Sequence, residues 1–176
     1  GLGPIDIDRD GLLDLVVAND TFSSVNSGAD HMPLPPGGVY FRCGPAEDCT
    51  WTWRGLGPGY EAWGSFMGLG NVHIEGLGDH IYVADLGPNR ATRYDNRRPI
   101  DVGRTLGIDI GYSGDYELFA WGVVIEDFDR DGRDDIYVSN GSVPSPRVGI
   151  FEAHYDGFFL QEPGGSFASI RPEEVG

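Results

Sequence analysis

The chain has 176 residues and carries 28 acidic side chains against 12 lysines and arginines, for a formal net charge of −16. Its 40% hydrophobic content excludes a disordered chain, and its 28 glycines and 12 prolines disfavour long helical bundles. No basic patch could hold a phosphate backbone, and no apolar run approaches the roughly 20 residues of a membrane span, so we expect neither a nucleic-acid partner nor a transmembrane segment.

One strand-like pattern recurs three times along the chain. Branched or aromatic apolar residues followed by a small residue and Asn or Asp occur at residues 15–19 (LVVAN), 81–85 (IYVAD) and 136–140 (IYVSN). Their starts are 66 and 55 residues apart, a spacing typical of propeller or solenoid units. The density of β-branched and aromatic residues between glycine-rich turns predicts strands. We therefore divide this single domain, residues 1–176, into approximate repeats 1–60, 61–115 and 116–176.

Further short apolar runs accompany the shared strand in each repeat. They occur at residues 39–42 and 51–53, at 67–74, 91–94 and 100–102, and at 121–125, 158–161 and 167–170. About four short strands per repeat is the content of one propeller blade, and no window of a dozen residues has helical periodicity. The sequence thus predicts an all-β fold of about three four-stranded blades. Because the chain starts immediately before an acidic loop, we expect the first repeat to lack its first strand.

The two cysteines, Cys43 and Cys49, are separated by five residues and lie beside Gly44 and Pro45. A pair this close favours a disulfide that staples a small loop in an oxidising compartment. Two free thiols in a cytosolic protein are the alternative. Zinc is disfavoured because no histidine or further cysteine lies nearby at ligand spacing.

Two acidic loops directly precede the shared strands of the first and third repeats. Residues 6–14 (DIDRDGLLD) and 127–135 (DFDRDGRDD) both fit D-x-D-x-D-G-x-x-D. Four like charges in nine residues repel one another unless a cation neutralises them. Glycine at position 6 permits a sharp turn, the carbonyl at position 7 can add an oxygen, and such hard oxygen ligands favour Ca²⁺. The predicted ligands of two calcium ions per chain are Asp6, Asp8, Asp10, Leu12 and Asp14, and Asp127, Asp129, Asp131, Arg133 and Asp135.

An EF-hand or dockerin-type loop shares the first half of this pattern. Such loops place a bidentate Glu at position 12 and lead into a helix. Position 12 is Val17 in the first loop and Val138 in the third repeat, each inside a predicted strand. We therefore predict a loop of β-hairpin type, closed by the aspartate at position 9. A solvated acidic turn is the remaining alternative, and it is disfavoured because the pattern occurs twice in register.

The middle repeat departs from the acidic pattern. Its equivalent positions hold Val72, Ile74, Gly76 and His80. We expect no calcium there, because apolar residues and glycine replace the charges that need a cation. A weak site built on Glu75 and Asp79 is the alternative.

The loop and strand DFDRDGRDDIYVSN resemble the FG-GAP and VCBS repeats of integrin α-subunit propellers and of many secreted bacterial proteins. The longer register is most similar to the bacterial relatives of cartilage acidic protein, in which a Trp-Gly strand such as Trp121-Gly122 leads into the calcium loop. Residues 89–94 and 164–167 match later parts of that pattern more loosely. The resemblance covers nearly the whole chain and implies a β-propeller, commonly seven-bladed, whose calcium positions map onto the eight loop aspartates.

The size of the chain bears on this resemblance. At about 60 residues per blade, 176 residues make three blades, whereas closed propellers have four or more. An open stack of three blades would leave two apolar faces bare. We therefore expect a section of a larger propeller, or a protomer that closes with partner chains, so that other blades are the first expected partners.

A calcium-stabilised module in the extracellular space, at the cell surface or in the periplasm is the leading functional hypothesis. Such a module would have a structural or adhesion-type role, with an extracellular protein or glycan as ligand. The chain is not expected to be an enzyme, because it has no G-x-S-x-G elbow, H-E-x-x-H motif or phosphate loop. The alternative is a propeller-type enzyme acting on an extracellular polysaccharide or another extracellular substrate.

The tryptophans bear on the choice of ligand. Trp51, Trp53, Trp63 and Trp121 could form stacking platforms for a glycan or protein. Propeller blades also pack tryptophans between their sheets, and we expect that packing for all four, above all for Trp121.

Overall fold

The computed structural model describes residues 2–17, 38–42, 51–55, 68–85, 88–96, 98–110, 112–113, 116–117, 119–141 and 155–170. Cys43, Cys49 and Trp63 lie outside these residues, as do the side chains of Trp51 and Trp53, so the predicted disulfide stays a prediction. In the described part of the chain, no helix is long and apolar enough to span a membrane.

Three four-stranded antiparallel sheets make up most of the described structure, which confirms the all-β prediction. Sheet 1 contains β1 (Leu2–Ile5), β2 (Asp14–Val17), β3 (Gly38–Arg42) and β4 (Trp51–Gly55). Sheet 2 contains β5 (Gly68–Ile74), β6 (Gly78–Ala84), β7 (Arg90–Asp95) and β8 (Arg98–Asp101). Sheet 3 contains β11 (Phe119–Glu126), β12 (Asp135–Gly141), β13 (Gly157–Gln161) and β14 (Phe167–Ile170). One short helix, α1 (Gly103–Leu106), and a two-stranded ribbon, β9 (Tyr112–Ser113) and β10 (Tyr116–Glu117), lie between sheets 2 and 3 in the chain.

The first repeat has the strand that the sequence was expected to lack. β1 pairs with β2 in antiparallel register from Leu2↔Val17 to Ile5↔Asp14. Gly3 and Pro4 give this segment a low strand propensity, and only four residues take part. Proline is tolerated because β1 is the edge strand of its sheet. The prediction was therefore wrong, and sheet 1 is as complete as the other two.

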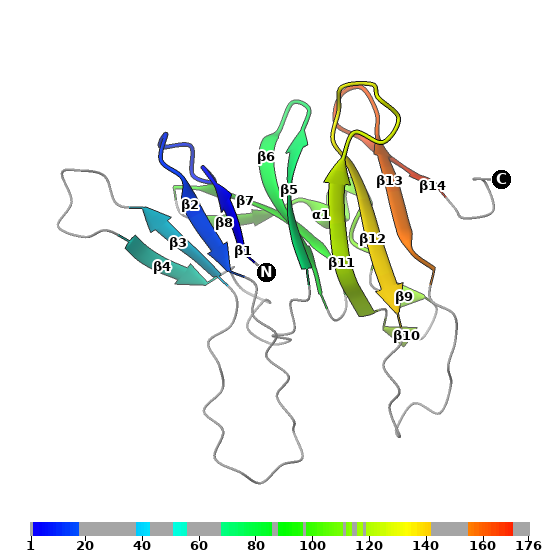
Figure 1. The fold of residues 1–176 in the computed structure, drawn as a ribbon, viewed down its shortest axis with the longest axis horizontal. Coiled ribbons are helices and arrows are strands. Elements are labelled where there is room, and N and C mark those ends of the chain that lie inside the picture. The colour runs from blue at the N-terminus through cyan, green and yellow to red at the C-terminus, as the bar shows by residue number, and fades with distance from the viewer. Residues whose placement is uncertain are drawn as a thin grey trace, which may run out of the picture.

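The sheets stack face to face, with sheet 2 in the middle (Figure 1). One apolar cluster joins sheets 1 and 2 and contains Ile5, Ile7, Val16, Ile81, Val83 and Tyr94. A second cluster joins the opposite face of sheet 2 to sheet 3, and its members include Val72, Ile74, Tyr82, Ile136, Val138 and Phe159. Because both faces of sheet 2 are covered, five consecutive residues, 80–84, are buried in β6.

Among the described sheets, none packs over Trp121 in the way that was expected. Its side chain is 40% exposed, and the register between β11 and β12 shifts between Ala120 and Gly122. A bulge of this kind interrupts the alternation of side chains across a strand and can turn one outward. Trp121 lies over Gly141 on the outer face of sheet 3, which no other described sheet covers, so its packing between blades stays a prediction.

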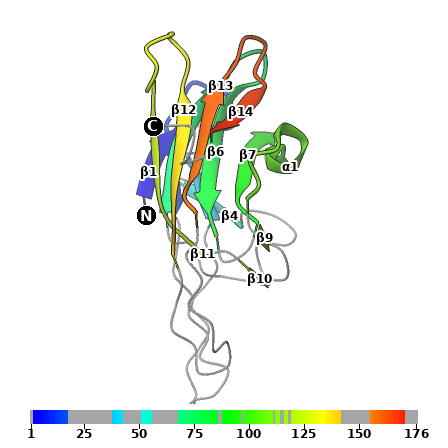
Figure 2. The ribbon, with the colours of Figure 1, turned by 90° about the vertical axis from the view of Figure 1, so that its right-hand side faces the viewer.

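The connections between the first two strands of all three sheets lie on the same side of the molecule (Figure 1). They are the two acidic loops, between β1 and β2 and between β11 and β12, and the β5–β6 hairpin. The β13–β14 turn reaches the same side, as the turned view also shows (Figure 2). The stacking order therefore places the middle hairpin between the two acidic loops.

Candidate metal centres

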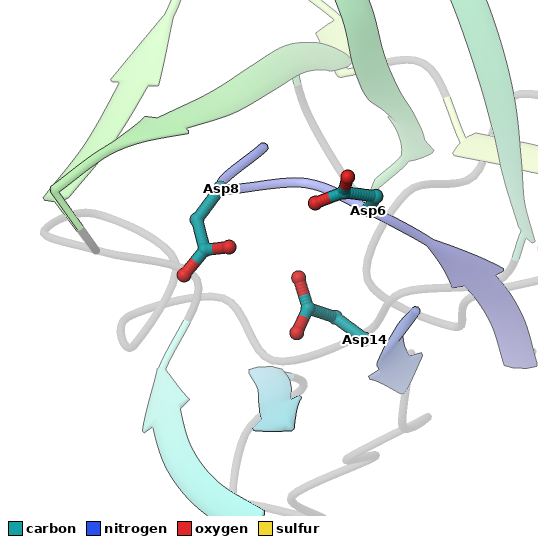
Figure 3. A group of neighbouring side chains, drawn as sticks. All are labelled: Asp6, Asp8 and Asp14. Atoms are coloured by element: carbon teal, nitrogen blue, oxygen red, sulfur yellow. The ribbon is translucent and has the colours of Figure 1, made fainter. Parts of the chain in front are cut away.

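Each acidic loop gathers three carboxylates. Asp6, Asp8 and Asp14 each offer one oxygen, and these oxygens lie within 4.8 Å of one another. Figure 3 shows the three side chains around one common space. The carboxylates of Asp127, Asp129 and Asp135 form the equivalent group within the same limit. Both groups use positions 1, 3 and 9, and within the described ranges no other set of three histidine, cysteine or acidic side chains is gathered this way.

The first aspartate of each loop shapes the backbone. The carboxylate of Asp6 accepts hydrogen bonds from Asp10 N (3.0 Å) and Gly11 N (2.9 Å). The carboxylate of Asp127 accepts the same two bonds, from Asp131 N and Gly132 N, both at 2.9 Å. Aspartate side chains commonly support tight turns in this way.

Positions 4 and 6 of both loops are left-handed. Arg9 and Gly11 have φ of 62° and 85°, and Arg130 and Gly132 have φ of 66° and 89°. A left-handed conformation costs a non-glycine residue about 1–2 kcal/mol, so both loops accept strain at the arginine to curl around the carboxylates. The two loops thus share one conformation although they lie in different sheets.

The aspartate at position 9 is buried and held by the backbone. Asp14 and Asp135 are 1% and 0% exposed. Asp14 Oδ2 accepts Ile7 N at 3.1 Å, and Asp135 Oδ2 accepts Phe128 N at 2.9 Å. A buried carboxylate is stable only when its charge is compensated by such bonds or by a cation. Position 9 therefore closes the loop, and backbone hydrogen bonds fix the orientation of its carboxylate.

The aspartates at position 5 are placed differently from the other three. Asp10 Oδ1 accepts Leu12 N at 2.8 Å, and Asp131 Oδ1 accepts Arg133 N at 2.9 Å. Asp131 Oδ2 is also paired with the Arg133 guanidinium. The structure therefore turns Asp10 and Asp131 toward the backbone of position 7 and outside the two gathered groups, although the pattern predicts all four aspartates as ligands. The spacing gave no sign that the Arg133 side chain would compete for Asp131.

The negative charge of the third-repeat loop is incompletely compensated. Desolvation, followed by the neighbouring carboxylates of Asp131, Asp135 and Asp127, raises the pKa of Asp129, and a hydrogen bond from Asp131 N opposes this only in part. A cation placed among these oxygens would remove the repulsion. Three gathered carboxylates supply the hard oxygen ligands that Ca²⁺ accepts, so the residues present fit this ion.

The middle repeat has a tight turn in place of an acidic loop. β5 and β6 remain paired as far as Ile74↔Gly78, which leaves only residues 75–77 for the turn. Val72 pairs with His80 as Glu126 pairs with Asp135. By strand register, loop position 1 of the middle repeat is thus His73. The comparison of the three repeats by sequence had placed it one residue earlier, at Val72. The alignment was wrong there because it could not detect that the hairpin is one residue shorter.

Glu75 and Asp79, the alternative site of the middle repeat, bond to other groups. Asp79 Oδ1 lies 2.6 Å from His73 Nδ1, and Glu75 Oε2 accepts Gly164 N at 2.9 Å. Neither belongs to a gathered group in the described part of the chain.

His80 takes the place of the buried closing aspartate in the middle repeat. The imidazole is fully buried, and its Nδ1 lies 2.7 Å from Gly78 O. Burial lowers the pKa of His80, with Arg93 and Arg9 acting in the same direction, and the Gly78 bond and Asp79 oppose it. The fold therefore prefers the neutral ring.

The buried His80 makes the stability of the fold depend on pH. In the unfolded chain the His80 imidazole takes up a proton near pH 6.5, whereas in the folded chain it does so only at lower pH. We expect the free energy of unfolding contributed by His80 to be complete above pH 6.5 and to decrease as the pH falls below it. Melting temperatures of the wild type and His80→Gln between pH 7.5 and 5.5 would measure this. A His73→Gln control, with an exposed ring, should keep the dependence, and an equal dependence in His80→Gln would contradict the assignment.

Gln161 is a residue that the sequence did not single out. Its side chain is 2% exposed and contacts both the β5–β6 hairpin and the third-repeat loop. The sequence predicted only that residue 161 ends a strand. Its partners lie 27 and 86 residues away, so no local pattern could have shown its role.

Comparison of the chain with models of known protein families and with curated proteins found no match. The chemistry of the two centres is therefore inferred from the residues of this chain alone.

Proposed function

We propose that this chain is a calcium-stabilised segment of a β-propeller, with a structural or adhesion-type role outside the cell toward a protein or glycan partner. The observation that carries the proposal is the double occurrence of one loop geometry. Two separate loops bring the carboxylates of positions 1, 3 and 9 within 4.8 Å of one another, with the same left-handed residues at positions 4 and 6.

Calcium is the ion that this donor set favours. Carboxylates are hard ligands, and Ca²⁺ accepts six to eight oxygens in flexible geometry, whereas Mg²⁺ demands a near-ideal octahedron and retains several waters. The bound ion would neutralise the three gathered carboxylates. The residues of the chain would position them through the backbone bonds to Asp6, Asp14, Asp127 and Asp135. Each ion would then pin together the first two strands of its sheet.

The proposed propeller is supported by the way the sheets stack. Tyr82 faces sheet 3 and is 0% exposed. Tyr137 is the residue of sheet 3 that corresponds to Tyr82. It pairs with Val124, which lies on the same outer face and is 49% exposed. On sheet 1, Leu15 is half-buried, whereas its counterpart Ile81 is fully buried. The two outer apolar faces thus correspond to faces that are covered within the stack, and we propose that further blades cover them.

An extracellular location is supported by the loop chemistry. The loops end in Asp at position 9 and lack the bidentate Glu of high-affinity EF-hand loops. Sites of extracellular modules bind calcium with dissociation constants of about 10⁻⁴–10⁻³ M, which extracellular calcium can fill.

Calorimetric titration with calcium tests the proposal. The wild type should bind two ions per chain, Asp6→Asn or Asp127→Asn should bind one, and the double variant none. Asp79→Asn is the matched control, because this aspartate is exposed and lies outside both groups. The proposal is wrong if the wild type binds no calcium, or if its stoichiometry is unchanged in the loop variants.

A further inference from the structure

The side-chain amide of Gln161 joins the β5–β6 hairpin to the third-repeat loop. Its Oε1 accepts Glu75 N at 2.7 Å, and its Nε2 donates to His73 O at 2.9 Å and to Asp134 O at 2.7 Å. One acceptor and two donors are thereby satisfied in a buried position. A carboxylate here would face two carbonyl oxygens, and an apolar side chain would leave three backbone groups unpaired.

The main chain of Gln161 contacts the same loop. Its N–H donates to Asp135 Oδ1 at 2.8 Å, and its carbonyl accepts Arg133 Nε at 2.9 Å. Together with the bond to Asp134 O, these contacts join Gln161 to positions 7, 8 and 9 of the loop, which are Arg133, Asp134 and Asp135. Gln161 therefore supports the gathered carboxylate of Asp135 by a direct hydrogen bond. It also holds Asp134 through its backbone carbonyl and Arg133 through its guanidinium.

The hairpin has further contacts with the third repeat. His73 N donates to Asp134 Oδ2 at 2.8 Å, and Gly164 N donates to Glu75 Oε2 at 2.9 Å. A Cβ at Gly165 would lie 2.3 Å from Glu75 O, so the β13–β14 turn approaches the hairpin backbone directly. This side of the hairpin is thus held along its edge and at its tip.

The other side of the hairpin contacts the first loop. Arg9 Nη2 donates to Leu77 O at 2.6 Å, and Asn71 Nδ2 donates to Pro4 O at 2.9 Å. Arg9 is position 4 of its loop and stands between Asp8 and Asp10 in the strained left-handed conformation. A change in the backbone conformation of the first loop would therefore move the Arg9 side chain, which bonds Leu77 O at the hairpin tip.

We propose that the β5–β6 hairpin couples the two calcium sites, with Gln161 as the positioning residue toward the third-repeat loop and Arg9 as its counterpart toward the first loop. This inference rests on the proposed calcium binding. An ion in either loop orders that loop and the hairpin bonded to it. The second ion then meets a hairpin that is already ordered and binds more tightly. Direct repulsion between two cations would give the opposite sign.

The test compares calcium affinities in a thermodynamic cycle. Asp127→Asn leaves only the first site, and Asp6→Asn leaves only the third-repeat site. In calorimetric titrations, the product of the two association constants of the intact chain should exceed the product from these single-site variants by about fivefold or more. In the Asp127→Asn protein, calcium should also slow hydrogen exchange of the Glu75 amide, which donates to Gln161.

Two variants remove the bridge without removing a gathered carboxylate. Gln161→Met deletes the amide contacts on one side, and Arg9→Met deletes the contact with Leu77 on the other. The same comparison is then repeated with Gln161→Met or Arg9→Met added to every protein. The product of the two association constants of the two-site chain should then equal the product from the single-site variants. Glu162→Gln is the control, because Glu162 is exposed and bonds Ser166 within its own turn. Circular dichroism checks folding, and Arg9→Met decides the question if Gln161→Met does not fold.

The outcomes separate this inference from the proposed function. Two ions that bind independently in the wild type, or coupling that survives in Arg9→Met, would overturn the coupling and leave calcium binding intact. A chain that binds no calcium would overturn the proposed function, and the coupling with it. Coupling in the wild type and in Glu162→Gln, lost in the bridge variants, supports the inference.

Discussion

Calcium is expected to raise the melting temperature of this protein by about 10–20 °C. At a free concentration about 100 times the dissociation constant, one site adds about 2.7 kcal/mol to the free energy of unfolding, because the ion binds only the folded loop. Two sites add about 5 kcal/mol, and each kcal/mol shifts the melting temperature of a chain this size by about 2–4 °C. Scanning calorimetry in calcium and after exhaustive chelation measures the difference.

Two controls accompany the calcium experiment. Magnesium at the same concentration should give a smaller shift, because its octahedral preference and tightly held waters fit the loops poorly. In Asp6→Asn or Asp127→Asn, the calcium shift should fall to about half, since one of the two gathered groups then lacks its first carboxylate. A melting temperature that is the same with calcium and with chelator would rule out a structural role for the ion.

Asn substitutions at positions 3 and 9 of the third-repeat loop are expected to act differently on the calcium-free protein. Asp135 is fully buried and accepts backbone N–H groups at both oxygens. In Asp135→Asn the side-chain NH₂ group faces one of these backbone N–H donors, which then has no acceptor. An unpaired buried N–H lowers the free energy of unfolding by about 1–3 kcal/mol, which lowers the melting temperature by about 2–12 °C. Asp129 is exposed, and desolvation together with the neighbouring carboxylates raises its pKa. Asp129→Asn should therefore leave the melting temperature in chelator unchanged or higher.

Both variants should weaken calcium binding, because both remove the charge of a gathered carboxylate. Melting curves in chelator and calorimetric titrations with calcium therefore separate the structural role of position 9 from the ligand role that we propose for both positions. Equal melting temperatures for the two variants in chelator would show that the backbone bonds to Asp135 contribute nothing to the calcium-free fold.

The acidic loops show how far a spacing pattern can predict a site. The repeated D-x-D-x-D-G-x-x-D pattern led to the three carboxylates that the structure gathers in each loop. It also included Asp10 and Asp131, which bond the backbone N–H of position 7 instead. An aspartate at this spacing can serve either an ion or a turn, and the pattern cannot distinguish the two uses.

Register was harder to predict than the existence of strands. β1 was missed because Gly3 and Pro4 weaken its local strand signal, and only pairing with β2 reveals it. In the middle repeat, the alignment placed position 1 at Val72, whereas the pairing of β5 with β6 moves it to His73. Pairing depends on contacts between strands, which a linear comparison does not contain.

By itself, the sequence determined the strand-rich class of the fold and the composition of both acidic loops. These depend on local alternation, turn residues and charge spacing, all of which act over a few residues. Only the tertiary structure decided that the middle hairpin lies between the two loops and that Gln161 bridges it to Asp134. Stacking brings these residues together from 27 and 86 positions apart in the chain, and no local propensity extends over such a separation.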